Sequence, residues 1–241
     1  MMLEQLNIEE VLFIDIETVP VVPKFEDLSP LWQNLWANKM RSSVTETVSP
    51  EDLYDRAGIY AEFGKIIVIS AGYLFRKDNE WHYRVKSFHD PDEAVLLNDF
   101  GSALNKFASS NKRRLCAHNG QEFDYPYIAR RMLVNRVEIP NLLNIAGMKP
   151  WETKEVLIDT LQLWKFGDFK HYTSLSLLCA LLDIPTPKDD IDGSQVAHVY
   201  YVEKDIDRII RYCEKDTLAV ANLMLRYKGL EIVSTENMHV V

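Results

Sequence analysis

The chain has 241 residues, of which 47% are apolar and 26% are charged, values that are ordinary for a soluble globular protein. This composition excludes a largely disordered chain, and only nine glycines and ten prolines exclude fibrous and low-complexity classes. The 27 basic and 36 acidic residues give a formal net charge of −9, which alone argues against a nucleic-acid partner because phosphates recruit Lys and Arg.

The three cysteines, Cys116, Cys179 and Cys213, are far apart and lie in apolar runs. Their odd number and the lack of a CxxC pair predict buried free thiols in a reducing compartment. The first residues carry acids where a signal peptide carries bases, and no apolar stretch reaches the roughly 20 residues that cross a bilayer. We therefore expect a cytoplasmic protein with no membrane partner.

Two runs rich in β-branched residues and one alternating run predict the first strands. Val11–Val19 stops at Pro20 and predicts a buried strand, and Lys65–Leu74 has the same character. Trp81–Phe88 alternates between apolar and polar residues, which is typical of an edge or half-exposed strand.

The stretch 21–64 interrupts this rhythm. It contains Trp32 and Trp36 at helical spacing, and Ser49–Asp52 has the composition of a helix start. We expect a helical insertion between the first two strands, lying against the core or over a site.

A helix is predicted after the third strand. Asp90 would be its N-cap, Pro91 its first residue and Glu93 the capping acid three residues after the cap. Residues 94–109 then place an apolar face on one side, made of Leu96, Leu97, Phe100, Leu104 and Phe107.

The rest of the chain alternates between predicted strands and helices. The strands are Arg114–His118 and Val156–Asp159, and the helices are Tyr125–Val134, Leu175–Leu182 and Glu203–Tyr227. This order predicts one α/β domain over residues 1–241, with a mixed central sheet flanked by helices. Residues 229–241 show no pattern and are expected to form a flexible tail.

Asp15 and Glu17 are two residues apart in the first strand, so their side chains leave the same face. Two carboxylates on a buried strand repel each other and are costly to desolvate, and a divalent cation between them removes that cost. The alternative is that one carboxylate caps a helix and the other pairs with an arginine.

Two further carboxylates lie at a predicted helix start and beside the apolar stripe of the last predicted helix. Asp124 follows the turn signal Asn119-Gly120 and opens a helix, where it would serve as a site residue or simply as an N-cap. On the last helix, Tyr212 and Asp216 lie about 40° apart beside the apolar stripe, where they would share a site or a solvated edge.

Together these residues supply four carboxylates and a phenol on separate elements. That set is typical of two divalent ions about 3.5–4 Å apart, which activate water and stabilise the leaving oxygen in phosphodiester hydrolysis. Oxygen ligands without a histidine or cysteine cluster favour Mg²⁺ or Mn²⁺ over Zn²⁺.

The strings FIDIET (13–18), HNGQEFD (118–124) and YCEKD (212–216), in this order, resemble the three motifs of the DEDD superfamily of 3′-5′ exonucleases. The tyrosine four residues before the last Asp is similar to the DEDDy branch. The chain most resembles bacterial predicted exonucleases related to the proofreading domain of B-family DNA polymerases, over roughly residues 9–228. IPTPKDDIDGSQV (184–196) is also similar to that family.

The resemblance implies an RNase H-like fold with two metal ions and assigns roles by analogy. Asp15 would bridge both ions, Glu17 and Asp216 would hold the ion that activates water, and Asp124 would hold the other. Tyr212 would position the nucleophilic water.

The same resemblance implies that Thr18, Asn119 and Phe123 contact the terminal nucleotide. The expected substrate is the 3′ end of single-stranded nucleic acid, with DNA favoured and RNA open. A chain of 241 residues leaves no room for a polymerase domain, so a proofreading role does not follow from the resemblance.

The charge distribution weakens the objection raised by the net charge. Residues 105–170 carry 11 basic and 7 acidic side chains, a net of +4, so the others carry −13. Lys112–Arg114, Arg130, Arg131 and Arg136 flank the second motif and would meet phosphates, or they form an ordinary solvated face.

Two other functions remain open. The string DIETV with Lys188-Asp189-Asp190 superficially matches a haloacid-dehalogenase-like phosphatase, although Glu17 stands where that pattern needs Asp. The second alternative is a non-catalytic RNase H-like module that binds nucleic-acid ends or a protein partner. Unneeded buried acids are costly, which argues against it.

Overall fold

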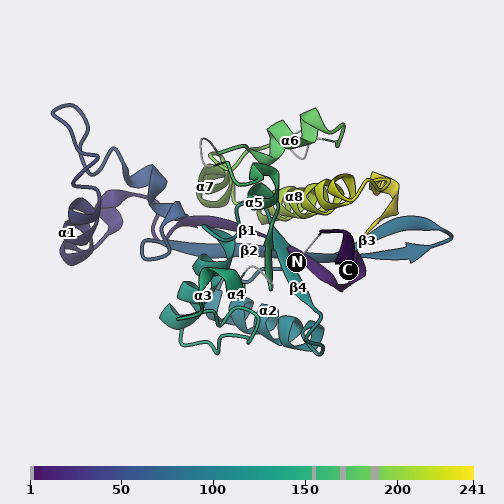
Figure 1. The fold of residues 1–241 in the computed structure, drawn as a ribbon. Coiled ribbons are helices and arrows are strands. Elements are labelled where there is room, and N and C mark those ends of the chain that lie inside the picture. The colour runs from purple at the N-terminus through teal and green to yellow at the C-terminus, as the bar shows by residue number, and fades with distance from the viewer. Residues whose placement is uncertain (1–2, 154–155, 169–171, 186–189) are drawn as a thin grey trace.

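The computed structural model describes residues 3–153, 156–168, 172–185 and 190–241. Within them, a mixed six-stranded sheet has the order β5-β4-β1-β2-β3-β6, and helices cover both of its faces (Figure 1). The strands are β1 Val11–Pro20, β2 Gly64–Lys77, β3 Glu80–Phe88, β4 Arg114–Ala117, β5 Leu157–Asp159 and β6 Met238–Val240. The helices are α1 Pro30–Lys39, α2 Glu93–Phe107, α3 Asp124–Val134, α4 Pro150–Thr153, α5 Thr160–Lys165, α6 Leu175–Leu181, α7 Val196–His198 and α8 Ile206–Tyr227.

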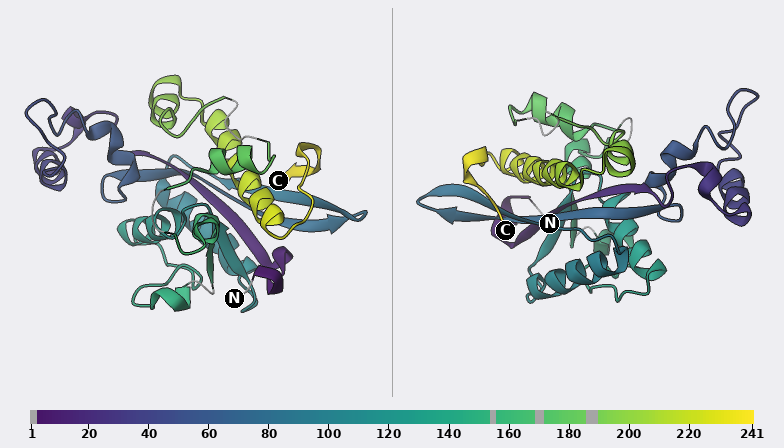
Figure 2. Two further views of the ribbon diagram at one scale, coloured as in Figure 1. Left: turned by 45° about the horizontal axis from the view of Figure 1, so that its top comes forward. Right: turned by 180° about the vertical axis from the view of Figure 1, so that it is seen from behind.

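Strand β1 lies inside the sheet and has a different core on each face. It runs antiparallel to β2 and parallel to β4, which itself runs parallel to β5. Ile14 and Ile16 pack with α2 and α3, whereas Phe13 packs with α8. Figure 2 shows α8 on one side of the sheet and α2 on the other. The alternation of a strand therefore sends residues 13, 15 and 17 toward α8.

The segment between β1 and β2 builds a small apolar cluster of its own. Trp36 of α1 is fully buried there, and its indole N–H donates to the carbonyl of Pro50 over 2.7 Å. Ser49 and Asp52 cap one another as a helix start does, but a 3₁₀ turn at Tyr54–Ile59 follows instead of an α-helix. In Figures 1 and 2 the segment projects from one end of the sheet.

The start of α2 differs from the prediction. Asp92 is the N-cap, two residues later than expected, and its carboxylate accepts from the N–H of Ala94. Glu93 is therefore free of any capping role. It is buried, forms an ion pair with Arg131 and accepts from the N–H of Ile66 over 2.7 Å. This pair ties α2 and α3 to the start of β2.

Replacing Arg131 by Met should lower the free energy of unfolding by about 3 kcal/mol, because Glu93 would be left as an uncompensated buried charge. Arg131 also donates to the carbonyl of Ala61, so the base of the insertion loses a contact as well. Urea denaturation measures this, with Arg130→Met as the exposed neighbouring control. Equal stabilities of the two variants would contradict the assignment.

Two further differences concern the C-terminal part. The last helix starts at Ile206 and not at Glu203, because Val199–Glu203 forms a π turn that ends at Lys204 with φ +59°. Residues 229–241 were expected to carry no element, yet β6 pairs in parallel with β3. Over Tyr83–Val85, β3 is therefore not an edge strand. Among the described residues, no helix is long and apolar enough to cross a membrane.

Candidate active site

Strand β1 presents Asp15 and Glu17 on the face covered by α8. A bulge follows directly, since Glu17 pairs with Val68 and Thr18 with Ile66, so that the register skips Ile67. Bulges re-aim side chains and are common beside active sites. Glu17 is 7% exposed and Asp15 is partly buried.

Helix α8 brings the third motif onto this strand. The buried thiol of Cys213 donates to Oδ2 of Asp15 over 3.3 Å, which fixes the helix against the carboxylate. Tyr212 and Asp216, one turn apart, are both buried, and the Tyr212 hydroxyl is hydrogen-bonded to Asp216. The prediction that this tyrosine and carboxylate share one edge of the helix is confirmed.

Asp124 of α3 lies against β1, beside Asp15 and Glu17. It is the first residue of α3, is 3% exposed, and its carboxylate accepts from the backbone N–H of Ile16, between the two acids of β1. Its Oδ1 atom is buried without a hydrogen-bond partner. Burial, aided by the charges of Asp159 and Asp216, raises the pKa of Asp124 to about 7.

Four carboxylates influence one another's ionisation. We call them the carboxylate cluster: Asp15, Glu17, Asp124 and Asp216. Burial raises the pKa of Asp15 well above its usual range, and the charges of Asp216, Glu17 and Asp124 raise it further. Carboxylates arranged in this way are stabilised by cations, and the unsatisfied Oδ1 of Asp124 offers a free ligand atom.

The donor atoms fit hard divalent cations. Oxygens of Asp15 and Glu17 and the sulfur of Cys213 lie within 4.8 Å of one another. Burial and the same two carboxylates raise the pKa of the Cys213 thiol, so it remains an S–H donor to Asp15. The available ligands are therefore carboxylate oxygens, the donors that Mg²⁺ and Mn²⁺ prefer.

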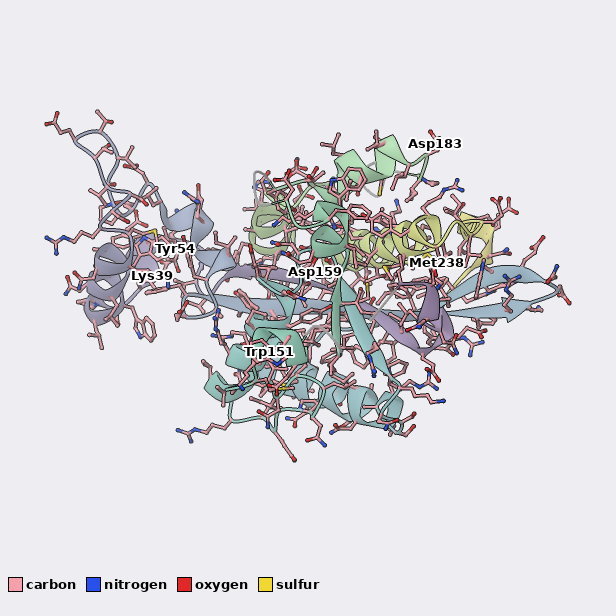
Figure 3. All side chains as sticks on the ribbon, viewed as in Figure 1. Lys39, Tyr54, Trp151, Asp159, Asp183 and Met238 are labelled. Atoms are coloured by element: carbon pink, nitrogen blue, oxygen red, sulfur yellow. The ribbon has the colours of Figure 1, made fainter. Side chains whose placement is uncertain are left out.

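The sequence did not reveal the role of Asp159, at the end of β5. Its buried carboxylate accepts from the backbone N–H groups of Asn119, Gln121 and Leu161 over 2.9–3.0 Å. These bonds hold the second motif's turn against α5. Figure 3 labels Asp159 in the middle of the molecule, away from Lys39 and Tyr54 of the insertion. An Asp between a strand and a helix is an N-cap signal that could have located it.

Of the three residues expected at the substrate, Thr18 follows Glu17, Phe123 precedes Asp124, and Asn119 lies in the turn before α3. Thr18 is hydrogen-bonded to the buried hydroxyl of Tyr127. Asn119 takes a left-handed conformation, with φ +63°, and its Oδ1 is buried without a partner. Phe123 precedes Asp124, is partly buried and packs at a tilt on Tyr127.

The basic residues expected to meet phosphates divide into different groups. Arg131 is committed to Glu93, so its expected phosphate contact is wrong. Arg114 pairs with Val11 at the start of β1, four residues before Asp15, and donates to the carbonyls of Asn111 and Arg113. Lys112, Arg130 and Arg136 are exposed.

The phosphatase pattern gains no support from the one member of its triplet that the structure describes. Asp190 forms an ion pair with Arg208 over 2.7 Å. Lys188 and Asp189 lie outside the described residues.

A mixed sheet covered on both faces, with acids from β1, α3 and α8 brought together, defines an α/β protein with an RNase H-like fold. The chain belongs to a family described as predicted 3′-5′ exonucleases related to the exonuclease domain of PolB, whose model matches residues 59–239. The match includes the second and third motifs, whereas Asp15 and Glu17 lie outside it.

Among solved structures, the chain is similar to the family B DNA polymerase from the hyperthermophilic archaeon Pyrobaculum calidifontis, with a TM-score of 0.57 and 14% identity. The similarity covers 90% of this chain and 24% of the polymerase chain. The chain thus spans about a quarter of that polymerase's length, and at this identity the likeness shows the fold alone. No curated protein sequence matches the chain.

Proposed function

We propose that the chain is a metal-dependent 3′-5′ exonuclease that hydrolyses phosphodiester bonds at the 3′ end of single-stranded DNA. The observation that carries the proposal is the carboxylate cluster, in which acids from β1, α3 and α8 are buried together, with Cys213 of α8 bonded to Asp15. Membership in a family of predicted 3′-5′ exonucleases supports it.

We assign the roles by analogy with the DEDDy exonucleases that the three motifs resemble. Asp15, central in the cluster, would contact both ions; Glu17 and Asp216 would hold one, and Asp124 the other. Two Mg²⁺ or Mn²⁺ ions supply the chemistry when bound, by activating a water and stabilising the leaving oxygen. The Tyr212 hydroxyl, neutral and bonded to Asp216, would orient the attacking water.

The substrate ends would be held by neighbouring groups. Thr18, Asn119 and Phe123 would contact the terminal nucleotide, with Asn119 offering an unpartnered oxygen. Exposed Lys112, Arg130 and Arg136 would give weak, sequence-independent attraction to phosphates. Since these groups read the backbone and one nucleotide, RNA ends are a second substrate to be tested.

The experiment uses 5′-labelled DNA and RNA single strands side by side, with Mn²⁺, Mg²⁺ or EDTA. We expect a ladder that shortens stepwise from the 3′ end with either metal, no product in EDTA, and faster cleavage of DNA. Binding of the strands without cleavage of any end would favour the non-catalytic module. Phosphate release from small phosphomonoesters, lost with Asp15→Ala but not with Asp216→Ala, would favour the phosphatase.

Replacing Tyr212 by Phe should lower kcat by about 10–100-fold with a KM within about 3-fold, because the hydroxyl orients water and does not bind the strand. The fold should be preserved, since only the oxygen atom is lost. Steady-state degradation of a 5′-labelled strand measures both constants. A rise in KM with kcat unchanged would contradict the assigned role and make Tyr212 a binding residue.

A further inference from the structure

One aromatic side chain near the carboxylate cluster has no role in the proposed reaction. Tyr172 lies two residues before Ser174, which caps α6, and 62% of its surface is exposed. Its ring packs edge-on against His118, with ring centroids 6.2 Å apart and planes at 68°. A large aromatic ring that remains mostly open to solvent has surface available for a ligand.

His118 fixes the position of this ring. One ring nitrogen, Nε2, lies 2.9 Å from the carbonyl of Thr173, and the other lies 2.9 Å from the hydroxyl of Thr160. A carbonyl can only accept, so Nε2 carries the proton and Nδ1 accepts from Thr160. Burial lowers the pKa of His118, which keeps this arrangement neutral. The backbone next to Tyr172 is therefore anchored to the end of β4 and the start of α5.

This anchor lies at the edge of the sheet that carries the site. Strands β1, β4 and β5 are parallel, and β1 runs on past the carboxyl ends of β4 and β5 with Asp15 and Glu17, at the kind of edge where open α/β sheets bind ligands. His118 directly follows β4, and Asp159 is the last residue of β5. After burial, the charges of Asp124, Asp159, Asp15 and Asp216 are the causes that raise the pKa of Tyr172. Because its ring packs on His118, which directly follows β4, the Tyr172 phenol lies at this edge and has an O–H to donate.

We infer that Tyr172 is a substrate-contacting residue that packs on the 3′-terminal nucleotide and donates its hydroxyl to a phosphate oxygen of that nucleotide. The inference rests on the proposed function, because it takes the strand end to lie at the carboxylate cluster. It adds an aromatic contact from the segment before α6, on a different element from Phe123. An aromatic platform is indifferent to base identity, as an exonuclease requires.

The test compares Tyr172→Leu, Tyr172→Phe and the control Phe166→Leu. Phe166 is 93% exposed and follows α5, so its replacement changes the same kind of surface. Binding of a labelled single strand is measured by fluorescence anisotropy in Ca²⁺, and kcat and KM are measured in Mn²⁺. Melting temperatures of all variants establish that each is folded.

Tyr172→Leu should raise Kd and KM about 10-fold or more, with kcat within about 3-fold, in line with the usual worth of one aromatic–base contact. Tyr172→Phe should raise Kd about 3–10-fold, the effect of one hydrogen bond to a charged group. Phe166→Leu should leave both constants unchanged.

Unchanged Kd and KM for Tyr172→Leu would overturn the inference while an active wild-type enzyme kept the proposed function intact. Equal losses for Tyr172→Leu and Phe166→Leu would also overturn it, because they would indicate a nonspecific surface effect. An inactive wild-type protein would instead refute the proposed function. The anisotropy measurement reads the Tyr172 contact separately from catalysis.

Discussion

Replacing Asp216 by Asn should lower metal-supported exonuclease activity by at least about 10³-fold while leaving the folded protein intact. Asparagine keeps the shape of the side chain and an oxygen that accepts from Tyr212, so the loss isolates the negative charge. Asp15→Asn should have an effect of at least the same size, because Asp15 is affected by the other three carboxylates. Initial rates of strand shortening in Mn²⁺ measure both.

The matched control for these variants is Asp207→Asn. Asp207 lies on the same helix but is exposed in its first turn, outside the carboxylate cluster. Its replacement should change activity by less than about 3-fold, within the range of surface substitutions. Activity of Asp216→Asn equal to that of Asp207→Asn would remove the third motif from the reaction. If Asp15→Asn alone fails to fold, the activity of Asp216→Asn decides the test.

The metal-free protein should become less stable as pH rises from about 4 to 7. In the folded chain the pKa of Asp124 is raised to about 7, whereas in the unfolded chain it is near 4. Between these values the folded state binds the extra proton, so raising the pH removes stability, in total up to about 4 kcal/mol. The raised pKa of Asp15 acts in the same direction.

Asp124→Asn isolates this contribution. His118, whose pKa burial lowers, opposes the trend at the acid end, but it is present in both proteins and cancels in the comparison. In EDTA, the variant should be about as stable as the wild type at pH 4 and more stable by about 2–4 kcal/mol at pH 8.

Added Mn²⁺ should reverse the order at pH 8, because only the wild type has the full ligand set. Urea denaturation at the two pH values, with and without Mn²⁺, measures the four differences. If the stability difference between the two proteins stays constant with pH, the raised pKa of Asp124 is contradicted.

The parts that the sequence predicted depend on local patterns. The alternation of β1 places Asp15 and Glu17 on one face, and helical periodicity places Tyr212 beside Asp216; both depend on residues within one element. The positions of β1 and β2 follow from runs of β-branched residues, and that of β3 from its alternation, whereas the order of the strands within the sheet was not predicted. The fold class and the candidate site residues could therefore be predicted from the sequence.

The parts that the sequence missed depend on contacts between distant residues. Glu93 has the spacing of a capping acid, but a buried arginine on α3 takes it instead. Strand β6 has three residues, too few for a pattern, and exists because β3 offers a free edge. Asp159 looks like an ordinary N-cap, yet it also holds a turn forty residues earlier in the chain.

The central claim is that Asp15, Glu17, Asp124 and Asp216 together hold two divalent ions. A crystal structure of the protein soaked in Mn²⁺ tests it most directly, through the anomalous scattering of the metal. We predict two peaks about 3.5–4 Å apart, both within bonding distance of Asp15, with oxygens of Glu17, Asp124 and Asp216 completing the ligands. No peak at the carboxylate cluster, or peaks only on exposed acids elsewhere, would contradict the account.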